Sequence, residues 1–228
     1  MQIEIWSDIA CPWCYVGKRR FEAALAGFEH RDEVEVTWRA FELDPAAPAE
    51  REGDLAERLA EKYGASVEQM RASQAQLAQV AAADGLDFRF DAVHSGNTFD
   101  AHRLVHLGAA HGLQDAVEER LMRAYQSEGE LMSDPAALER LGVDAGLPAG
   151  AVRALLAGDE FADAVRDDER TAAALGISAV PFFVADRRFG VSGAQSPEVL
   201  GQFLRQAWEA RPQVEVVAGG DAGGADGC

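Results

Sequence analysis

The chain has 228 residues, which is enough to bury a complete hydrophobic core without a disulfide or a metal ion to support it. Its 39 acidic residues outnumber its 21 lysine and arginine residues, and the net charge of −18 argues against a surface that follows the phosphates of a nucleic acid. No run of eighteen apolar residues occurs, which excludes a transmembrane helix, so we expect neither a nucleic-acid nor a membrane partner.

The first residues lead directly into a strand pattern, without the basic start and apolar stretch of a secretory signal. We therefore expect the protein in the cytoplasm. Three cysteines are too few and too unevenly spaced for a structural disulfide framework. In a reducing compartment, a close pair of cysteines indicates catalysis or metal binding instead.

The first forty residues predict a strand, a helix and a second strand. An apolar strand begins at Ile3, and a helix pattern with one apolar face runs from about Pro12 to Phe28. Residues 34–38 then alternate apolar and polar side chains, as a half-buried strand does. This order is typical of a parallel βαβ unit.

The rest of the chain predicts a helical block followed by a return to strands. Residues 45–158 show helix patterns broken by glycines, and Ser66 with Gln69 forms a capping box for one of these helices. A helix at about 159–175, a hairpin at 180–191 and a final helix from Ser196 to about Ala210 complete the order.

The simplest architecture for this order is an α/β fold with a large all-helical insertion. Residues 1–44 and 159–211 would form one discontinuous sheet domain, and residues 45–158 would form the insertion. Residues 212–228 are rich in glycine and aspartate, which predicts a disordered tail, and Cys228 in that tail has no cysteine near it in sequence.

The segment Cys11-Pro12-Trp13-Cys14 places Cys11 at the start of the first predicted helix, with Pro12 in the first helical position. Unpaired backbone N–H groups and the helix dipole stabilise a thiolate there, so we expect a lowered pKa for Cys11. Cys14 lies one turn further on, close enough to resolve a mixed disulfide formed at Cys11. Trp13 adds no positive charge, so we expect weaker oxidising power than a histidine there would give.

Two other interpretations of the cysteine pair are weaker. A structural zinc site needs four ligands, and the second cysteine pair that would supply them is missing. His102 and His106 could share a helix face, but no cysteine accompanies them. Two inert buried cysteines are the remaining alternative. We therefore expect redox or thiol-transfer chemistry and no metal ion.

Pro181, in the segment GISAVPFFV, cannot donate to a sheet ladder, so it must lie at the start or the edge of a strand. A cis Val180–Pro181 bond would leave the Val180 backbone free to contact a peptide or thiol bound beside Cys11. For an isolated Val-Pro pair, an ordinary trans edge proline is the commoner arrangement.

Four segments together resemble the DsbA-like thioredoxin-fold family, and in particular its cytoplasmic FrnE-type branch. They are WSDIACPWCYVGKRRFE, NTFDAHRL, GISAVPFFV and VSGAQSPEVL. The resemblance implies a thioredoxin fold with a helical insertion and a cis-proline loop facing the cysteines. It also implies that Cys11 is the nucleophile, that Cys14 resolves the intermediate, and that Val180, Pro181 and Trp13 position the substrate.

Several charged residues near the cysteine pair have open roles. Asp8 could act as an acid–base group if it is buried, or it could be a solvated turn residue, and Glu4 is an alternative for the same role. Lys18 and Arg19 are interpreted as a solvated helix face. For His102, a packed or surface position is favoured over a catalytic role.

A neighbouring branch contains kappa-type glutathione transferases and 2-hydroxychromene-2-carboxylate isomerases, in which a serine occupies the catalytic position. The two cysteines of this chain instead favour dithiol–disulfide exchange. Asn97, Ser192 and Gln195 lie in segments where that branch contacts glutathione, so they are candidates for binding a small thiol, with helix-cap and turn roles as the alternative.

The sequence therefore predicts a cytoplasmic thiol–disulfide oxidoreductase that holds no cofactor tightly and uses glutathione or another low-molecular-weight thiol as co-substrate. Its partner would be a protein or small molecule that carries a disulfide or thiol, and a homodimer is the expected assembly. A glutathione-dependent isomerase or transferase on the same scaffold is one alternative, and a non-catalytic zinc-binding or interaction module is another.

Overall fold

The structure is a computed structural model that describes residues 1–211. The predicted disordered tail at 212–228, including Cys228, lies outside the described residues. Within the described part of the chain, no helix is both long enough and apolar enough to cross a membrane.

Four strands form one mixed sheet in the order β2-β1-β3-β4. β1 (Gln2–Ser7) pairs in parallel with β2 (Glu35–Ala40) and antiparallel with β3 (Phe182–Ala185). β4 (Phe189–Ser192) completes the hairpin with β3. The predicted parallel βαβ unit and the predicted hairpin are both confirmed, with strand boundaries that differ by one or two residues.

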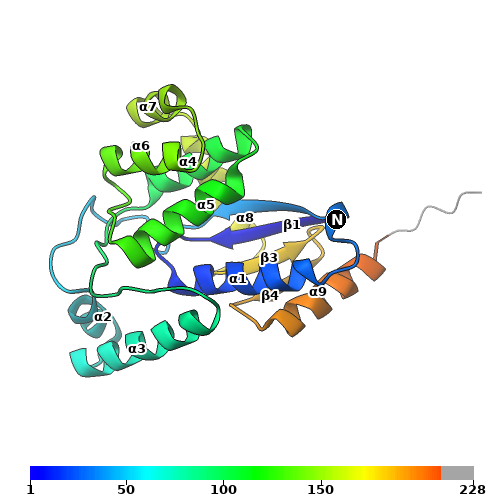
Figure 1. Cartoon of the computed structure of the whole chain (residues 1–228), viewed down its shortest axis with the longest axis horizontal. Helices are drawn as coiled ribbons and strands as arrows, with labels where there is room; N and C mark the ends of the chain where they lie inside the picture. The colour runs from blue at the N-terminus through cyan, green and yellow to red at the C-terminus, as the bar shows by residue number, and fades with distance from the viewer. Residues whose placement is uncertain (212–228) are drawn as a thin grey trace, which may run out of the picture.

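The two faces of the sheet carry different helices, as the alternation of side chains along a strand requires. On one face α1 (Pro12–Ala26) packs beside α9 (Pro197–Glu209), and Phe21 of α1 stacks on Phe183 of β3 at 5.4 Å between ring centroids. α8 (Ala162–Ala174) lies behind the sheet in Figure 1 and packs on its other face. The sheet is thus the middle of three layers.

The insertion consists of two groups of helices, which Figure 1 shows below and above the level of the sheet. The lower group is a hairpin of α2 (Leu55–Tyr63) and α3 (Val67–Ala83). The upper group contains α4 (Phe99–Ala110), α5 (Gln114–Arg123), α6 (Pro135–Asp144) and α7 (Ala149–Ala157). A short π-helix, Ala124–Glu128, follows α5, and a 3-10 helix, Arg31–Glu33, precedes β2.

The local signals predicted from the sequence explain several helix ends. The side chain of Ser66 accepts from the backbone N–H of Gln69 at 3.1 Å, and the Gln69 side chain accepts from the Ser66 N–H at 2.9 Å, so the capping box is confirmed. α8 begins later than predicted because Phe161 adopts a left-handed conformation with φ of 61°. The predicted α/β fold with a helical insertion is confirmed.

Candidate active site

The turn that follows β1 places Cys11 at the N-cap of α1. Cys11 has extended backbone angles, φ −86° and ψ 111°, and Pro12 occupies the first turn of the helix. The Cys11 N–H donates to the carbonyl of Asp8 at 3.0 Å, and the Cys14 N–H donates to the carbonyl of Cys11 at 3.0 Å. The backbone therefore fixes both cysteines at the end of the helix that attracts negative charge.

The two thiols have different surroundings, although both are free. Cys11 is 6% exposed and lines a cavity of about 550 Å³, whereas Cys14 is 0% exposed. Burial raises the pKa of the Cys14 thiol well above its ordinary value, and the neighbouring Cys11 raises it further. Of the pair, Cys11 is the thiol that a ligand in this cavity can approach.

The loop before β3 lies directly against the cysteine pair. The Cys11 thiol donates to the carbonyl oxygen of Val180 at 3.7 Å, and the Val180–Pro181 peptide bond is cis. Gly17 of α1 packs on the same loop so closely that an added Cβ would lie 2.8 Å from Pro181 Cγ. The fold thus brings together Cys11, Cys14 and the Val180–Pro181 loop, which were predicted to form one site.

Asp8 is a buried carboxylate, and the alternative of a solvated turn residue is wrong. It is 2% exposed, and it accepts from the backbone N–H groups of Leu43 at 2.7 Å and Ala10 at 3.1 Å. Its Oδ1 atom lies 3.5 Å from Nε2 of His102, an ion-pair contact longer than a usual hydrogen bond. Burial raises the pKa of Asp8, but the interactions with His102 and the two N–H groups outweigh it and lower the pKa below its ordinary value.

His102 lies on α4 and is buried, as the sequence predicted, but it is also the ionic partner of Asp8. Burial lowers its pKa, and the nearby carboxylates, Asp8 first among them, raise it to a net value above the ordinary one. Asp8 and His102 therefore form a buried pair of opposite charges behind the turn that carries Cys11.

Glu118 of α5 belongs to the same buried region and was not identified from the sequence. Its Oε1 atom accepts from the Ser7 hydroxyl at 3.0 Å, and burial raises its pKa to about 7 against the opposing effect of His102. The signal that could have found it is helical spacing, since Val117, Glu118 and Leu121 lie on one buried face.

Lys18 was predicted on a solvated helix face, and that prediction is wrong. Its side chain is 1% exposed, and its Nζ atom donates to Glu22 at 2.5 Å and to Asp115 at 2.6 Å. The ammonium group also lies 5.2 Å from the centre of the Trp38 ring. α5 covers this part of α1, so the lysine is enclosed by acidic and aromatic side chains that the sequence pattern of α1 does not reveal.

Glu4, the alternative acid–base candidate, belongs to a separate ion-pair cluster. Its carboxylate accepts from Arg39 at 2.7 Å and from Arg187 at 2.9 Å. Burial raises the pKa of Glu4, but these two guanidinium groups outweigh it and lower the pKa. Glu4 therefore has arginine partners and does not line the cavity beside Cys11.

The three candidates for thiol binding make contacts within the chain and away from Cys11. Asn97 accepts from the Phe99 N–H at 2.8 Å and donates to Glu42 at 3.3 Å, and Gln195 donates to the Ser192 carbonyl at 2.8 Å. None of the three lines the cavity beside Cys11. Their role in binding a thiol stays a prediction.

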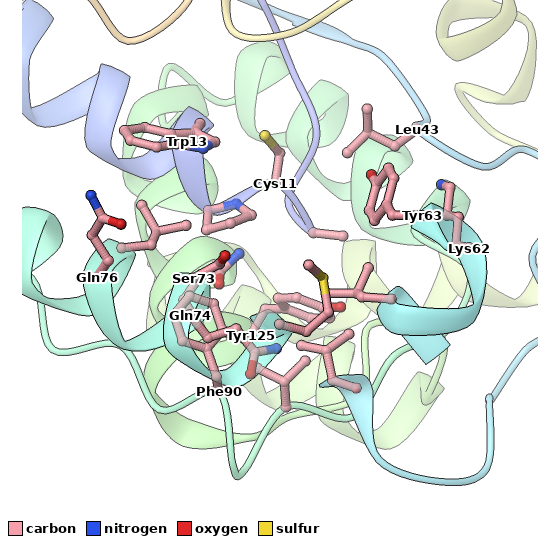
Figure 2. Close-up of a pocket in the computed structure, with 18 of the residues that line it drawn as sticks. Cys11, Trp13, Leu43, Lys62, Tyr63, Ser73, Gln74, Gln76, Phe90 and Tyr125 are labelled. Carbon is pink, nitrogen blue, oxygen red and sulfur yellow. The ribbon is translucent and has the colours of Figure 1, made fainter. Parts of the chain in front are cut away.

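The cavity beside Cys11 is formed between the start of α1 and the α2–α3 hairpin. Figure 2 shows Cys11 and Trp13 on one side, with Ser73 and Gln74 of α3 across from them. Its floor and sides are largely apolar and include Leu55, Leu59, Met70, Leu77, Phe90 and Val93. The sequence predicted that the helical block forms one wall of a cleft over Cys11, and the lining confirms this. Which helices form that wall was not predicted, because nothing local shows that the α2–α3 hairpin folds back toward Cys11.

A smaller cavity of about 160 Å³ adjoins the first and shares its lining at Leu43, Leu59 and Lys62. Arg51 and Arg58 also line the smaller cavity, together with the carboxylates of Asp8 and Asp44. Within residues 1–211, no three or more histidine, cysteine or acidic side chains are grouped so that they could hold a metal ion.

Comparisons with known proteins show the family and the fold. Residues 2–205 match the profile of the DSBA-like thioredoxin domain. The crystal structure of a probable DsbA oxidoreductase from Streptomyces coelicolor is 49% identical and covers 100% of this chain and 98% of its own, with a TM-score of 0.90. The uncharacterized protein YwbO of Bacillus subtilis (strain 168) is 46% identical over 46 residues, so this chain matches only 21% of the length of that curated relative.

Two more distant structures share the fold. The cytosolic disulfide reductase DsbM from Pseudomonas aeruginosa, solved with GSH, is 20% identical with a TM-score of 0.65, covering 92% of this chain and 100% of its own. A 2-hydroxychromene-2-carboxylate isomerase is 12% identical with a TM-score of 0.64, covering 93% of this chain and 100% of its own.

Proposed function

The chain belongs to the DSBA-like thioredoxin domain family, and from this premise we propose that it is a cytoplasmic thiol–disulfide oxidoreductase that works through Cys11 and Cys14. One observation carries the proposal, which is the difference between the two thiols. Cys11 caps a helix and lines a cavity, whereas Cys14 is fully buried one turn further on with a raised pKa. This asymmetry suits a nucleophile and a resolving thiol.

In the proposed reaction, the Cys11 thiolate attacks one sulfur of a substrate disulfide. The substrate S–S bond breaks, one substrate thiolate leaves, and a mixed disulfide forms at Cys11. Cys14 then loses its proton and attacks the Cys11 sulfur, which releases the second substrate thiol and leaves a Cys11–Cys14 disulfide. The substrate gains two electrons and the protein loses two, and the same steps in reverse oxidise a dithiol.

The surrounding groups would position this exchange. The Val180 carbonyl, which accepts from the Cys11 thiol, holds that sulfur beside the Pro181 loop, and Trp13, 43% exposed, forms one side of the cavity. Asp8 is the proposed acid–base group, because its carboxyl group is buried in the turn that precedes Cys11 and its carbonyl accepts from the Cys11 N–H.

A low-molecular-weight thiol such as glutathione is the proposed reductant that returns the disulfide form to the dithiol. The shared fold with DsbM, a cytosolic reductase solved with GSH, supports both this co-substrate and the cytoplasmic location. The proposed substrates carry a disulfide or a thiol. A homodimer stays a prediction.

The proposal is tested by the glutathione-dependent reduction of a disulfide, insulin or 2-hydroxyethyl disulfide. We expect turnover by the wild-type protein, none by Cys11→Ser, and strongly reduced turnover by Cys14→Ser. Unchanged exchange in Cys11→Ser would overturn the proposal, and tight stoichiometric zinc in the purified protein would favour a zinc-binding module instead.

A glutathione-dependent isomerase is the second candidate, favoured by the shared fold with the 2-hydroxychromene-2-carboxylate isomerase. Such a reaction activates the thiol of glutathione and does not cycle a protein disulfide, so it does not require Cys14. Turnover of a chromene carboxylate with glutathione that survives Cys14→Ser would support this candidate over the first.

A further inference from the structure

We infer that the cavity beside Cys11 binds a small disulfide or thiol with a largely apolar body and one carboxylate, and that Lys62 receives the carboxylate. The inference rests on the proposed function, since it names the class of substrate that Cys11 would attack.

The size and the depth of the site favour a small molecule. A volume of about 550 Å³ lies within the range of roughly 300–1,000 Å³ that small-molecule pockets occupy. Cys11 is nearly buried, so a folded protein cannot easily present a disulfide to its sulfur, whereas a small molecule in the cavity can. Trp13 and Tyr63, both exposed, lie at opposite sides of the site in Figure 2 and offer aromatic surfaces to the same ligand.

The lining of this cavity does not suit a ligand with several charges. Its polar side chains are mainly uncharged, Ser73, Gln74, Gln76 and Gln126 among them. Glutathione carries two carboxylates and an ammonium group, and each charge removed from water without a partner has a high free-energy cost. In the proposed cycle, glutathione therefore supplies electrons, and another molecule fills the cavity.

A single anionic group, by contrast, has a place. Lys62 lines both cavities, and Arg51 and Arg58 line the smaller one beside it. Within residues 1–211, only Arg51 of these three cations forms an ion pair with a carboxylate, that of Asp44. Asp8 and Asp44 also line the smaller cavity, but they pair with His102 and Arg51. Arg58 and Lys62 therefore leave positive charge beside the apolar cavity, which favours a negative group there.

Arg58 has a supporting position. Its guanidinium group donates to the carbonyl of Gly53 and to the hydroxyl of Ser95, both at 2.6 Å. These contacts fix its charge at the wall of the smaller cavity. Lys62 has greater freedom, because it is exposed at the end of α2, where Figure 2 shows it beside Tyr63. Lys62 is therefore the cation that can reach a carboxylate in the larger cavity.

The test uses a Cys14→Ser, Cys228→Ser background, in which a mixed disulfide at Cys11 accumulates. Its formation rate is measured with 4-(phenyldisulfanyl)benzoic acid, which carries a single carboxylate, with the matching carboxamide, with oxidised glutathione and with 2-hydroxyethyl disulfide. Each rate is divided by the rate of the same reagent with free 2-mercaptoethanol, which removes differences between the leaving groups.

We expect the corrected rate for the aromatic acid to be about fivefold higher than that for its carboxamide, which is what an exposed ion pair between Lys62 and the carboxylate allows. The corrected rate for the aromatic acid should also exceed that for oxidised glutathione. Lys62→Gln should abolish this preference, and high salt should weaken it. Arg71→Gln is the matched control, because Arg71 is an exposed cation on α3 that lines neither cavity, and it should leave the preference unchanged.

Two results would overturn the inference and leave the proposed function intact. They are equal corrected rates for acid and carboxamide, and a corrected rate for oxidised glutathione above that for the aromatic acid. Failure of Cys11 to react with every reagent, including the small uncharged 2-hydroxyethyl disulfide, would instead overturn the proposed function on which the inference rests.

Discussion

The Cys11 thiol contacts the carbonyl oxygen of Val180 at 3.7 Å, although 169 positions of sequence separate the two residues. The register of the sheet produces this contact. Trp6 at the end of β1 pairs with Phe182 at the start of β3, so the turn that leaves one strand meets the loop that enters the other. The position of the nucleophile therefore depends on the packing between α1 and that loop.

Gly17 tests this packing. In Gly17→Ala, the new methyl group would lie 2.8 Å from Pro181 Cγ, so the helix or the loop must move. We expect a loss of stability of about 1–3 kcal/mol, typical of overpacking, together with slower reaction of Cys11 with 2-hydroxyethyl disulfide. Urea unfolding and the rate of mixed-disulfide formation measure the two effects.

Gly150→Ala is the control for this substitution, because Gly150 lies in α7 with open space around its Cα. It should leave the reactivity of Cys11 unchanged and should not lower stability. If Gly17→Ala matched Gly150→Ala in both measurements, close packing of the helix on the Pro181 loop would be refuted.

Glu118 gives a pH-dependent prediction. Its folded-state pKa of about 7 lies above the ordinary 4.5, so the folded state binds a proton more tightly and stability falls as pH rises through this range. Glu118→Gln removes that loss and keeps an acceptor for the Ser7 hydroxyl. We expect it to raise the free energy of unfolding by up to about 3 kcal/mol at pH 8, and to have little such effect below pH 4.5.

Urea unfolding at several pH values measures this difference, and Glu68→Gln, at an exposed position on α3, is the control that should show no comparable trend. A Glu118→Gln effect of the same size at pH 4.5 and pH 8 would show that Glu118 does not titrate as its buried position implies.

The Asp8–His102 pair predicts a stability window with two limits. The pKa of Asp8 is lowered in the folded state, so its charge adds to the stability of the protein above pH 3.8, the ordinary pKa of the group. This stabilisation is lost as pH falls through the folded-state pKa. The pKa of His102 is raised in the folded state, so its charge adds to the stability of the protein below pH 6.5, the ordinary pKa of the group. This stabilisation is lost as pH rises through the folded-state pKa. Both contributions are therefore present between about pH 4 and pH 6.5.

Asp8→Asn should remove about 3 kcal/mol within this window, because it leaves the His102 charge buried without its partner. At alkaline pH, where His102 is neutral in both states, the loss should be smaller. Asp8→Asn combined with His102→Gln should recover part of the loss at pH 5.5. An identical loss at pH 5.5 and pH 9 would show that Asp8 and His102 are not an ion pair.

Two substitutions of Lys18 separate the contribution of its buried charge to stability from that of its buried methylene groups. Lys18→Met removes the charge but keeps the contact of the side chain with Trp38. The carboxylates that lose their partner, Glu22 and Asp115, are 40% and 67% exposed, so water can solvate them. We therefore expect the free energy of unfolding to fall by about 1 kcal/mol. Lys18→Ala also removes the buried methylene groups of the side chain, so it should lower the free energy of unfolding by about 3 kcal/mol. Arg19→Ala, at a partly exposed ion pair, is the control. Equal losses in Lys18→Ala and Arg19→Ala would contradict the burial of Lys18.

The parts of the molecule that the sequence predicted are those with local signals. Strand alternation, the proline in the first turn after Cys11, and the capping box at Ser66 each depend on neighbouring residues, so the order of elements could be derived. The meeting of Cys11 with the Val180 loop is not local. The residues alone left it as one alternative beside a trans edge proline, and the resemblance to a known family made it the expected arrangement.

The missed features depend on which elements pack together. Lys18 has the composition of a surface residue, and only the position of α5 shows that it is buried. Glu118 is of the same kind, since a helix pattern shows which side chains share a face but not what that face covers. A wall of the cleft from the helical block was expected, but not that α2 and α3 in particular supply it. Asp8 lies between these cases, because burial was stated as the condition for its role.

The most direct test of the thiol chemistry uses two variants that both lack Cys228. In Cys14→Ser, 2-hydroxyethyl disulfide should add one mercaptoethanol group by intact mass, and peptide mapping should place it on Cys11. In Cys11→Ser, the remaining buried Cys14 should stay unmodified over the same time. Modification of Cys14 in preference to Cys11, or of neither thiol, would contradict the assignment of Cys11 as the nucleophile.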